Sequence, residues 1–570
     1  MYTTSTAFLE ALQEAGVSYV FANLGSDHPG LIEAFAEARA TGRKVPAIVT
    51  CPNEFVALSA AQGYAQVAGR AQAVVVHVEC GTQALAGAVH NVAKCRIPVL
   101  IFAGASPFTQ QGELKGSRNE FIHWYQDVFD QRGLVRGYVK YENELRTGRN
   151  VKQIVYRALQ IAHSDPKGPV YLVGPREVLV EEIPPPAADA ADWQPISPGA
   201  LPPDGVAEIA DDLIRAKRPL IVTSYVGRNI RAVEELIRLC RRLGVGVLES
   251  VPNSFNFPQD DPLYQGNQWN EQRQNQTLAD ADAIVVVDSD VPWIPLVNRP
   301  KPDAIIHYID IDPLKQQMPL WSIPARRVFR ADAATALQQI NDRLETARID
   351  PKSVEKRQAH YKRRHDRRAA ELARRERPKD EVITPEYLTA CVRKHVDDTT
   401  LVLNEGITSY QTINTHLRMT RPGSVFTSGA SSLGWNGGAA IGAKLACPDK
   451  TVIALTGDGS YLFSMPSTVH WMARRYRTPF LQVVYNNRGW KAPKMSTLAI
   501  LPEGHASRAD EFGVSFDPPP DYSAIAAAAG GAFARKVERA GQLEAALAEA
   551  LAVVRAEKRC AVLDVWLPHL

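Results

Sequence analysis

Cysteine is scarce in this sequence, and the few cysteines present are not paired. The chain has 570 residues and seven cysteines, spread along its length and never arranged as C-x-x-C. Disulfide-stapled secreted proteins and structural zinc sites need even-numbered or closely spaced cysteines. We therefore expect neither a disulfide framework nor a zinc site.

Long apolar runs and a strong charge of one sign are missing as well. No stretch approaches the roughly 20 apolar residues that cross a bilayer, and the first residues lack the basic start and apolar core of a secretory signal. Lys and Arg number 65 against 62 Asp and Glu, a formal net charge of +3. This balance favours neither a nucleic-acid partner nor a membrane surface, so we expect a soluble, cytoplasmic protein.

Apolar, β-branched segments alternate with alanine-rich helical segments along nearly the whole chain. This alternation is typical of parallel α/β sheets. A chain of 570 residues is also too long for one hydrophobic core. We predict an α/β fold of three doubly wound parallel-sheet domains, with strands that include residues 19–24, 73–78, 99–103, 219–227, 245–250, 283–290, 304–312, 400–404, 451–456, 480–485 and 560–565.

Two breaks in the alternation divide the chain. Residues 181–203 are rich in proline, which predicts an extended linker. Residues 346–380 contain a strongly basic run. That run could serve an anionic partner, but we interpret it as a solvated, helical connector. The predicted domains are therefore residues 1–180, 204–345 and 381–570.

The segment 451–490 carries the most informative motif. A predicted strand ends in Gly457, Asp458, Gly459 and Ser460, and the next predicted strand ends in two asparagines, of which Asn487 is the second, followed by Gly489. Glycines let the backbone approach a diphosphate, and the following helix offers its N-terminal amides to the anion.

The same segment supplies ligands for a metal. The carboxylate and the amide oxygen lie at the ends of parallel strands, where open α/β sheets bind their ligands. Magnesium prefers oxygen ligands and is often held by one or two protein groups plus phosphate oxygens. The sequence therefore predicts a metal–diphosphate cradle.

This combination resembles the signature of thiamine-diphosphate enzymes. The chain is similar, over its whole length, to the superfamily of acetolactate (acetohydroxyacid) synthases, benzoylformate decarboxylase, benzaldehyde lyase and cyclohexanedione hydrolase. The resemblance implies an N-terminal pyrimidine-binding domain, a central nucleotide-fold domain and a C-terminal diphosphate-binding domain. It also implies that Asp458, the side chain of Asn487 and the carbonyl of Gly489 hold Mg²⁺.

Three further stretches carry the resemblance. CPNEFVALSAAQGYAQVAGR resembles the family segment whose glutamate, here Glu54, bonds the aminopyrimidine ring and helps to deprotonate the thiazolium. Residues 427–446 resemble the segment in which an apolar residue, here Leu433, bends the cofactor and a backbone carbonyl, here that of Ser431, accepts its amino group. Gly406 and Thr408 lie where relatives contact the diphosphate, and Trp490 is a further expected contact.

The substrate side is predicted from the N-terminal third. Ser26, Asp27 and His28 follow the first predicted strand, where relatives carry a polar residue facing the thiazolium. His77 precedes a glycine-rich turn that resembles that of benzoylformate decarboxylase, and a histidine of near-neutral pKa suits acid–base work. The adjacent pair Gln110 and Gln111 resembles a glutamine that contacts the reacting carbonyl in synthases and lyases. Residues 491–508 could form a lid.

These features predict a thiamine-diphosphate-dependent lyase or carboligase acting on a small 2-oxo acid or acyloin. A non-oxidative 2-oxo-acid decarboxylase of the benzoylformate type is the alternative, and a non-catalytic nucleotide-binding protein is an alternative of another class. FAD in the central domain is possible, but no motif supports it. The resemblance implies active sites built by two chains, hence a homodimer at minimum and a homotetramer as in many relatives.

Overall fold

The computed structural model describes residues 2–570 and divides into two compact units. The first unit combines Met1–Ile196 with Ser428–Val537 and Ala545–Leu570, and the second combines Ser197–Thr427 with Glu538–Glu544. The strands form three six-stranded sheets, and the paired strands within each unit run parallel. The predicted three-sheet α/β class is confirmed.

The N-terminal sheet belongs to the first unit and has the strand order β2-β1-β3-β4-β6-β5. Its strands are β1 (Tyr19–Ala22), β2 (Ala47–Thr50), β3 (Gln72–Val76), β4 (Val99–Ala105), β5 (Tyr141–Glu144) and β6 (Pro169–Pro175). Its helices are α1 (Thr4–Glu14), α2 (Pro29–Thr41), α3 (Glu54–Ala68), α4 (Val78–Ala84), α5 (Ala86–Lys94), α6 (Ile122–Tyr125), α7 (Val151–His163) and α8 (Arg176–Leu179). Aliphatic and aromatic side chains of this sheet pack with α1, α2 and α7 into one core.

The central sheet lies in the second unit and has the order β12-β11-β10-β7-β8-β9. Its strands are β7 (Pro219–Thr223), β8 (Gly246–Ser250), β9 (Tyr264–Gln268), β10 (Ala283–Val287), β11 (Ile305–Asp310) and β12 (Arg327–Arg330). The helices here are α9 (Pro203–Arg215), α10 (Ile230–Leu243), α11 (Gln276–Asp280), α12 (Ala333–Glu345), α13 (Pro351–Arg375), α14 (Pro385–Arg393) and α15 (Tyr410–Leu417). The same unit holds the paired strands β13 (Thr400–Glu405) and β14 (Val425–Thr427).

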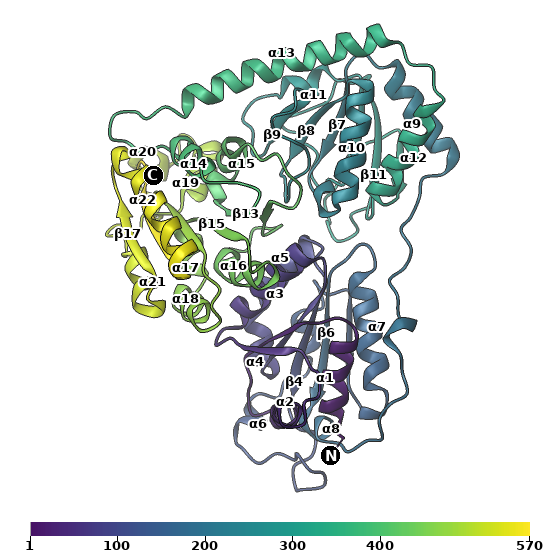
Figure 1. Ribbon diagram of the computed structural model, residues 1–570, viewed down its shortest axis with the longest axis vertical. Coiled ribbons are helices and arrows are strands. Elements are labelled where there is room, and N and C mark those ends of the chain that lie inside the picture. The colour runs from purple at the N-terminus through teal and green to yellow at the C-terminus, as the bar shows by residue number, and fades with distance from the viewer. Residues whose placement is uncertain (1) are drawn as a thin grey trace. The chain divides into compact units, whose positions relative to one another are not determined.

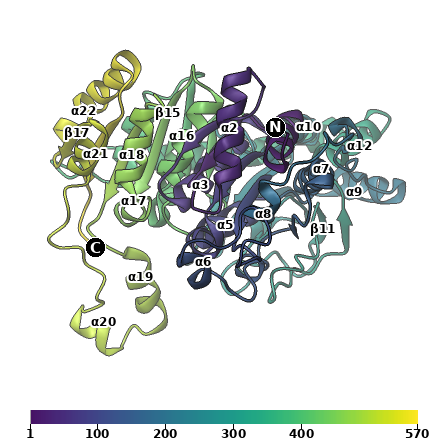
Figure 2. The ribbon, with the colours of Figure 1, turned by 90° about the horizontal axis from the view of Figure 1, so that it is seen from below.

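The C-terminal part of the first unit carries β15, β16, β18 and β17, in that order across the sheet. These strands are β15 (Thr451–Gly457), β16 (Leu481–Asn486), β17 (Phe533–Val537) and β18 (Ala561–Trp566). The helices are α16 (Trp435–Ala446), α17 (Asp458–Phe463), α18 (Pro466–Arg475), α19 (Lys491–Ile500), α20 (His505–Ala509), α21 (Tyr522–Gly530) and α22 (Ala540–Ala552). Figure 2 shows α19 and α20 on a segment that extends away from this sheet.

Helices α3 and α16 pack closely within the first unit (Figure 1). A Cβ atom at Gly63 would lie 2.3 Å from the carbonyl oxygen of Ala439, and one at Gly442 would lie 1.9 Å from that of Ala60. Small residues therefore let the two backbones touch. This contact holds α3, which begins at Glu54, against α16.

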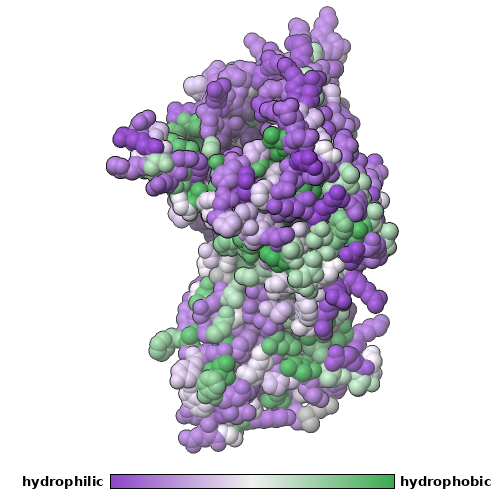
Figure 3. All heavy atoms as spheres, turned by 90° about the vertical axis from the view of Figure 1, so that its left-hand side faces the viewer, coloured by the Kyte–Doolittle hydropathy of each residue, from purple (hydrophilic) through white to green (hydrophobic). Residues whose placement is uncertain are grey.

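The surface is mainly hydrophilic on the face shown in Figure 3, where hydrophobic residues gather in smaller patches. The basic run predicted as a helical connector forms α13, of which Arg357 and Tyr361 are buried. Among the helices in residues 2–570, none combines the length and the apolar character that a membrane span requires.

Candidate active site

Glu54 begins α3 and points back toward the end of β1. Asn53 caps the helix by accepting a hydrogen bond from the backbone amide of Val56 at 3.1 Å. The Glu54 side chain accepts a hydrogen bond from Nδ2 of Asn23 at 2.8 Å and is only half-buried. The cap thus sets the start of the helix, and Asn23 sets the direction of the carboxylate.

A buried aspartate orients His77 beside this glutamate. Oδ1 of Asp27 lies 2.5 Å from Nδ1 of His77, and Oδ2 accepts the backbone amide of Val78 at 3.1 Å. Val78 has a φ of 22°, a strained value for a β-branched residue. With Nδ1 engaged by Asp27, the other ring nitrogen of His77 is directed away from the aspartate.

The charges of this pair shift both pKa values. Burial alone would raise the pKa of Asp27, but the charges and hydrogen bonds of His28 and His77 lower it well below its usual range. Burial lowers the pKa of His77, yet the hydrogen bond and the charge of Asp27 outweigh burial, and the net pKa is raised. Glu54 adds to this increase, so the three groups form one electrostatic cluster.

Two glycines make room for the pair. A Cβ at Gly25 would lie 2.0 Å from Nδ1 of His77, and one at Gly104, near the end of β4, would lie 1.5 Å from Oδ2 of Asp27. His28 is fully buried and its Nδ1 lies 3.1 Å from Oδ1 of Asp27. The structure therefore brings Ser26, Asp27 and His77 together and places His28 behind them, as a buried support.

Gln126 and His123, which no sequence motif singled out, join this cluster. Nε2 of Gln126 lies 3.8 Å from Sγ of Cys80, and a hydrogen bond between the Gln126 side chain and His77 adds to the raised pKa of His77. Oγ of Ser26 lies 3.4 Å from Nε2 of His123. The sequence offered one indication of these two residues: a histidine and a glutamine lie close together in the segment that follows a predicted buried strand.

Gln110 and Gln111 lie elsewhere. Both are exposed, and their backbone amides bind the carboxylate of Glu113. Within residues 2–570 no hydrogen bond joins either side chain to Asp27, His77 or Ser26. The structure therefore does not bring Gln110 and Gln111 to the Asp27–His77 cluster, whereas Gln126 lies beside it.

The C-terminal cradle forms where β15 and β16 end side by side. The two strands pair in parallel, with Gly457 opposite Tyr485. Asp458 is 4 % exposed and accepts the backbone amides of Gly459 at 2.8 Å and Gly489 at 3.0 Å. The two glycine-containing loops are thereby locked to each other through one carboxylate.

The two asparagines at the end of β16 have different roles. Nδ2 of Asn486 donates to Oδ1 of Asp564 at 2.8 Å, which ties β16 to β18. Oδ1 of Asn487 is buried and has no hydrogen-bond partner among the described residues. Burial raises the pKa of Asp458 to about 6, because the backbone amides around it do not offset the loss of solvent. A buried carboxylate and an orphaned amide oxygen together suit a divalent cation.

Other predicted contacts line the same cradle. A Cβ at Gly459 would lie 2.1 Å from the Trp490 ring, which itself packs edge-on against Phe463 at 5.8 Å. Ser460 is buried and its Oγ has no partner in the described chain. Only glycine therefore fits under the Trp490 ring.

The loop before α16 is pinned by the N-terminal sheet's helices. Asn91 donates to the carbonyl of Ser432 at 2.8 Å and accepts its amide at 3.2 Å. Ser431 is exposed and Leu433 is half-buried in this loop. In the second unit, Gly406 is buried after β13 and Thr408 is exposed in the short turn that follows.

At the carboxyl ends of the central strands, buried charged side chains pair with one another. Lys315 is fully buried, with Nζ 2.8 Å from Asp310 and 2.7 Å from Asp290. A Cβ at Gly227 would lie 1.7 Å from the carbonyl oxygen of Phe255, so the backbone approaches closely there.

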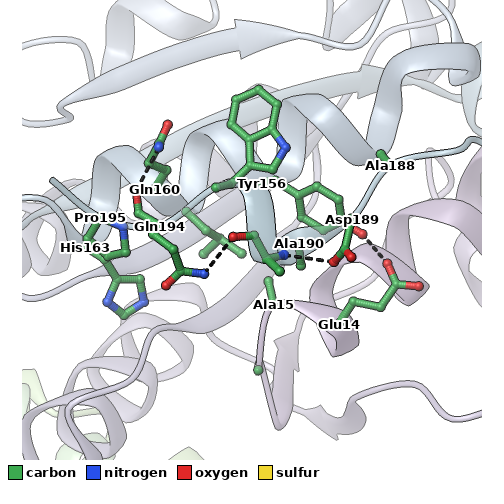
Figure 4. A pocket seen from close by; sticks show the side chains of 14 residues that line it. Glu14, Ala15, Tyr156, Gln160, His163, Ala188, Asp189, Ala190, Gln194 and Pro195 are labelled. Carbon is green, nitrogen blue, oxygen red and sulfur yellow. Dashed lines mark hydrogen bonds between the residues drawn. The ribbon is translucent and has the colours of Figure 1, made fainter.

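A separate cavity of about 780 Å³ lies under the segment that follows the N-terminal sheet (Figure 4). It is lined by residues of α1, α7 and the 188–195 segment, including Glu14, Tyr156, His163 and Asp189. None of the predicted site residues lines it. The cavity is therefore distinct from both clusters described above.

Relatives of known function cover most of the chain. Benzoylformate decarboxylase of Pseudomonas aeruginosa is 26% identical over 85% of this chain and 86% of its own. Probable acetolactate synthase 2 of Oryza sativa is 26% identical over 98% and 82%. Sulfoacetaldehyde acetyltransferase of Castellaniella defragrans is 24% identical over 86% and 82%.

Solved structures share the fold at lower identity. The 4-hydroxybenzoylformate decarboxylase of Rhodococcus jostii RHA1 superposes with a TM-score of 0.78 at 21% identity, covering 100% of this chain and 99% of its own. Benzoylformate decarboxylase of Polynucleobacter necessarius gives a TM-score of 0.79 at 20% identity, with coverage of 100% and 99%.

Family models match all three parts of the sequence. The N-terminal TPP binding domain matches residues 2–134, the central domain residues 206–340 and the C-terminal TPP binding domain residues 406–565. These matches together span most of the chain, and they contain the Glu54 and Asp458 clusters. The protein belongs to the thiamine pyrophosphate enzyme family.

Proposed function

We propose that this protein is a thiamine-diphosphate- and Mg²⁺-dependent lyase or carboligase that acts on a small 2-oxo acid or acyloin. The observation that carries the proposal is the pair formed by Asp458, a buried carboxylate, and Asn487, whose buried Oδ1 has no partner in the described chain. Relatives that are decarboxylases, synthases and acetyltransferases support the same class.

Each cradle residue has a defined task in this proposal. Asp458 and Asn487 would hold Mg²⁺ together with the carbonyl of Gly489, and the amides at the start of α17 would receive the diphosphate. The chemistry supplied by the cofactor, when bound, is a nucleophilic carbon that adds to a carbonyl and retains the electron pair of the broken bond. The rest of the work falls to the chain's own groups.

The N-terminal cluster would handle protons. Asn23 holds the Glu54 carboxylate in one direction at 2.8 Å. Asp27 holds Nδ1 of His77, so that Nε2 is the nitrogen that can give or take a proton. Because the raised pKa of His77 keeps it protonated nearer to neutral pH, His77 acts first as a proton donor.

The His77 geometry favours a second candidate function, a non-oxidative 2-oxo-acid decarboxylase. A proton donor at this position would promote protonation and release of an aldehyde rather than capture by a second substrate. Product analysis separates the two: acetolactate or acetoin from pyruvate indicates ligation, whereas free aldehydes from a panel of aliphatic and aromatic 2-oxo acids indicate decarboxylation.

We further propose that two chains build each site, so that a homodimer is the smallest active form and a homotetramer the assembled one. In the single chain Glu54 remains half-exposed. Proton transfer at the cofactor needs that carboxyl group shielded from water. A second chain laid over the start of α3 would provide the shielding.

Calorimetric titration with thiamine diphosphate tests the cofactor assignment. The wild type is expected to bind only with Mg²⁺, and Asp458→Ala is expected to lose that binding while the exposed-site control Asp449→Ala keeps it. Glu54→Gln should bind but exchange the C2 proton of the cofactor at least tenfold more slowly. A folded wild type that binds no thiamine diphosphate would overturn the proposal.

A further inference from the structure

Two buried residues of α8 hold the loop after β4 through hydrogen bonds. Nε of Arg176 donates to the carbonyl of Gly116 at 2.5 Å, and Nη2 donates to Oδ1 of Asn119 at 2.5 Å. Glu177, beside it, accepts the amide of Thr109 at 3.0 Å. Arg176 and Glu177 are each 5 % exposed, so this loop has a fixed position although much of its outer surface is open to solvent.

The fixed loop presents His123 to Ser26. His123 is 3 % exposed, and its Nδ1 accepts the backbone amide of Asn119 at 3.3 Å. A backbone amide can only donate, so Nδ1 must carry a lone pair and the neutral ring must carry its proton on Nε2. The opposite tautomer would set one N–H against another. Nε2 is the nitrogen that lies 3.4 Å from Oγ of Ser26.

The charge state of His123 agrees with this tautomer. Burial lowers the pKa of His123, and the nearby charge of Arg176 lowers it further, although Glu120 opposes this. The ring is therefore neutral at neutral pH and donates through Nε2.

Ser26 is left with one hydrogen to give. Its Oγ accepts from His123, and its backbone carbonyl is held by Nη1 of Arg176 at 3.3 Å. The neighbouring Asp27 carboxylate is already engaged by His77 and by the amide of Val78. Nothing in this arrangement requires the Ser26 hydroxyl hydrogen, so it can be directed toward a ligand.

We propose that His123 is a positioning residue that sets the Ser26 hydroxyl as a hydrogen-bond donor to a carbonyl or carboxylate oxygen of the substrate. This inference rests on the proposed function, because it needs an oxygen-bearing substrate beside Ser26. His123 itself touches Ser26 and the loop backbone; Ser26 is the group that would touch substrate.

The test uses acylphosphonates as probes, because they mimic a 2-oxo acid with a phosphonate in place of the carboxylate. Holoprotein saturated with thiamine diphosphate and Mg²⁺ is titrated with acetyl- and benzoylphosphonate, and binding is followed by calorimetry and circular dichroism. We expect Ser26→Ala and His123→Leu each to weaken the tighter probe at least tenfold without changing the affinity for thiamine diphosphate. The double variant should be no weaker than Ser26→Ala.

Conservative replacement separates positioning from packing. His123→Gln keeps an N–H donor near the position of Nε2 and should recover most of the lost affinity, which a purely space-filling role would not predict. His360→Leu on α13 controls for a histidine-to-leucine change. Should His123→Leu not fold, Ser26→Ala and its double variant with His123→Gln carry the same comparison.

The outcomes distinguish the two claims. Unchanged probe affinity in His123→Leu, or a double variant whose losses add, overturns the positioning role while leaving the proposed function intact. A wild type that binds no thiamine diphosphate overturns the proposed function itself. A wild type that binds thiamine diphosphate but neither probe removes the 2-oxo-acid substrate class and the inference with it.

Discussion

At the scale of single residues, the closest approach of a side chain to a glycine is that of Asp27 to Gly104. Replacing Gly104 by alanine would place a Cβ 1.5 Å from Oδ2 of Asp27. The aspartate must then move, and overpacking of this kind costs about 1–3 kcal/mol. We expect Gly104→Ala to lower the free energy of urea-induced unfolding by that amount. Gly137→Ala is the matched control, since a Cβ there meets nothing within 4 Å; equal stability of the two variants would contradict the geometry.

The Asp27–His77 pair also predicts a pH dependence. Because the pKa of His77 is raised in the folded state, this residue stabilises the fold fully below about pH 6.5, the pKa of an unfolded histidine. That stabilisation is lost as the pH rises through the pKa of His77 in the folded state. Because the pKa of Asp27 is lowered in the folded state, this residue stabilises the fold fully above about pH 3.9, the pKa of an unfolded aspartate. That stabilisation is lost as the pH falls through the pKa of Asp27 in the folded state. Asp27→Asn should therefore destabilise most between about pH 4 and 6.5, by about 1.5–3 kcal/mol.

Unfolding curves of wild type and Asp27→Asn across pH 3–9, roughly the interval that brackets both unperturbed pKa values, measure this window. NMR titration of His77 should show its pKa lower in Asp27→Asn than in the wild type. A stability difference that stays constant over the whole interval would exclude the ion pair as its cause.

The cradle residues could be predicted because they are close in sequence and follow strands. Asp458 and Asn487 each stand next to a strand end, so parallel pairing alone brings them together. His123 lies in the four-residue helix α6 and Gln126 directly follows it, within a long connection between β4 and β5 whose sequence shows no clear periodicity. Arg176, about fifty residues further on, holds this connection through Asn119, and a single sequence does not reveal that contact.

At the scale of elements, two apolar strands of the C-terminal sheet were predicted closely, whereas the polar strands and the apolar strand β6 were not. The predictions over 451–456 and 480–485 agree with β15 and β16 to within one residue at each end. β5, with sequence YENE, lies at a sheet edge, and β9, with sequence YQGNQ, carries mostly polar side chains. Strands of this kind lack the apolar run by which a buried strand is predicted from sequence. They lie at a sheet edge, or their polar side chains are hydrogen-bonded, so apolar side chains are not required.

The segment that carries α19 and α20 is the element with the clearest expected motion. Ile500 is 73% exposed and Leu501 is 59% exposed, while Lys494 pairs with Asp510 at 2.8 Å inside the same segment. Few contacts to the sheet and exposed apolar side chains are typical of a lid that is open without ligand.

We expect saturation with thiamine diphosphate, Mg²⁺ and an acylphosphonate to slow tryptic cleavage after Lys491 and Arg508 at least fivefold, as measured by mass spectrometry. Cleavage after Arg375, at the end of α13, serves as the internal reference, and equal slowing at both places would contradict a local closure.

At the scale of the whole molecule, a group of exposed aromatic side chains favours the proposed second chain. Phe121 is 76% exposed and Tyr125 is 82% exposed, and Phe129 is fully open to solvent. Isolated apolar residues are common on surfaces, but a close series of aromatic ones marks an interaction site. They lie on the same loop that carries His123 and Gln126, so a second copy bound there would also cover the proposed site.

Mixing two defective variants tests whether each site is shared between chains. Glu54→Gln impairs the N-terminal contribution and Asp458→Ala the C-terminal one, so neither homodimer contains an intact site. In a mixed dimer with shared sites, one site combines both substitutions and the other combines neither. Random co-assembly makes half of the dimers mixed, so about a quarter of all sites should be intact, as expected for a symmetric two-chain assembly.

The readout is C2-proton exchange of bound thiamine diphosphate, which does not require the substrate to be known. Co-expressed variants carrying different tags, purified through both tags, should show fast exchange at one site in two. Glu54→Gln alone should show only slow exchange, and Asp458→Ala alone should bind no cofactor. Sites built within one chain would give no fast exchange in the mixed dimer, since every chain then carries a defect in its own site. Fast exchange would place Glu54 of one chain over the cradle of the other and explain why the carboxylate stands half-exposed in the isolated subunit.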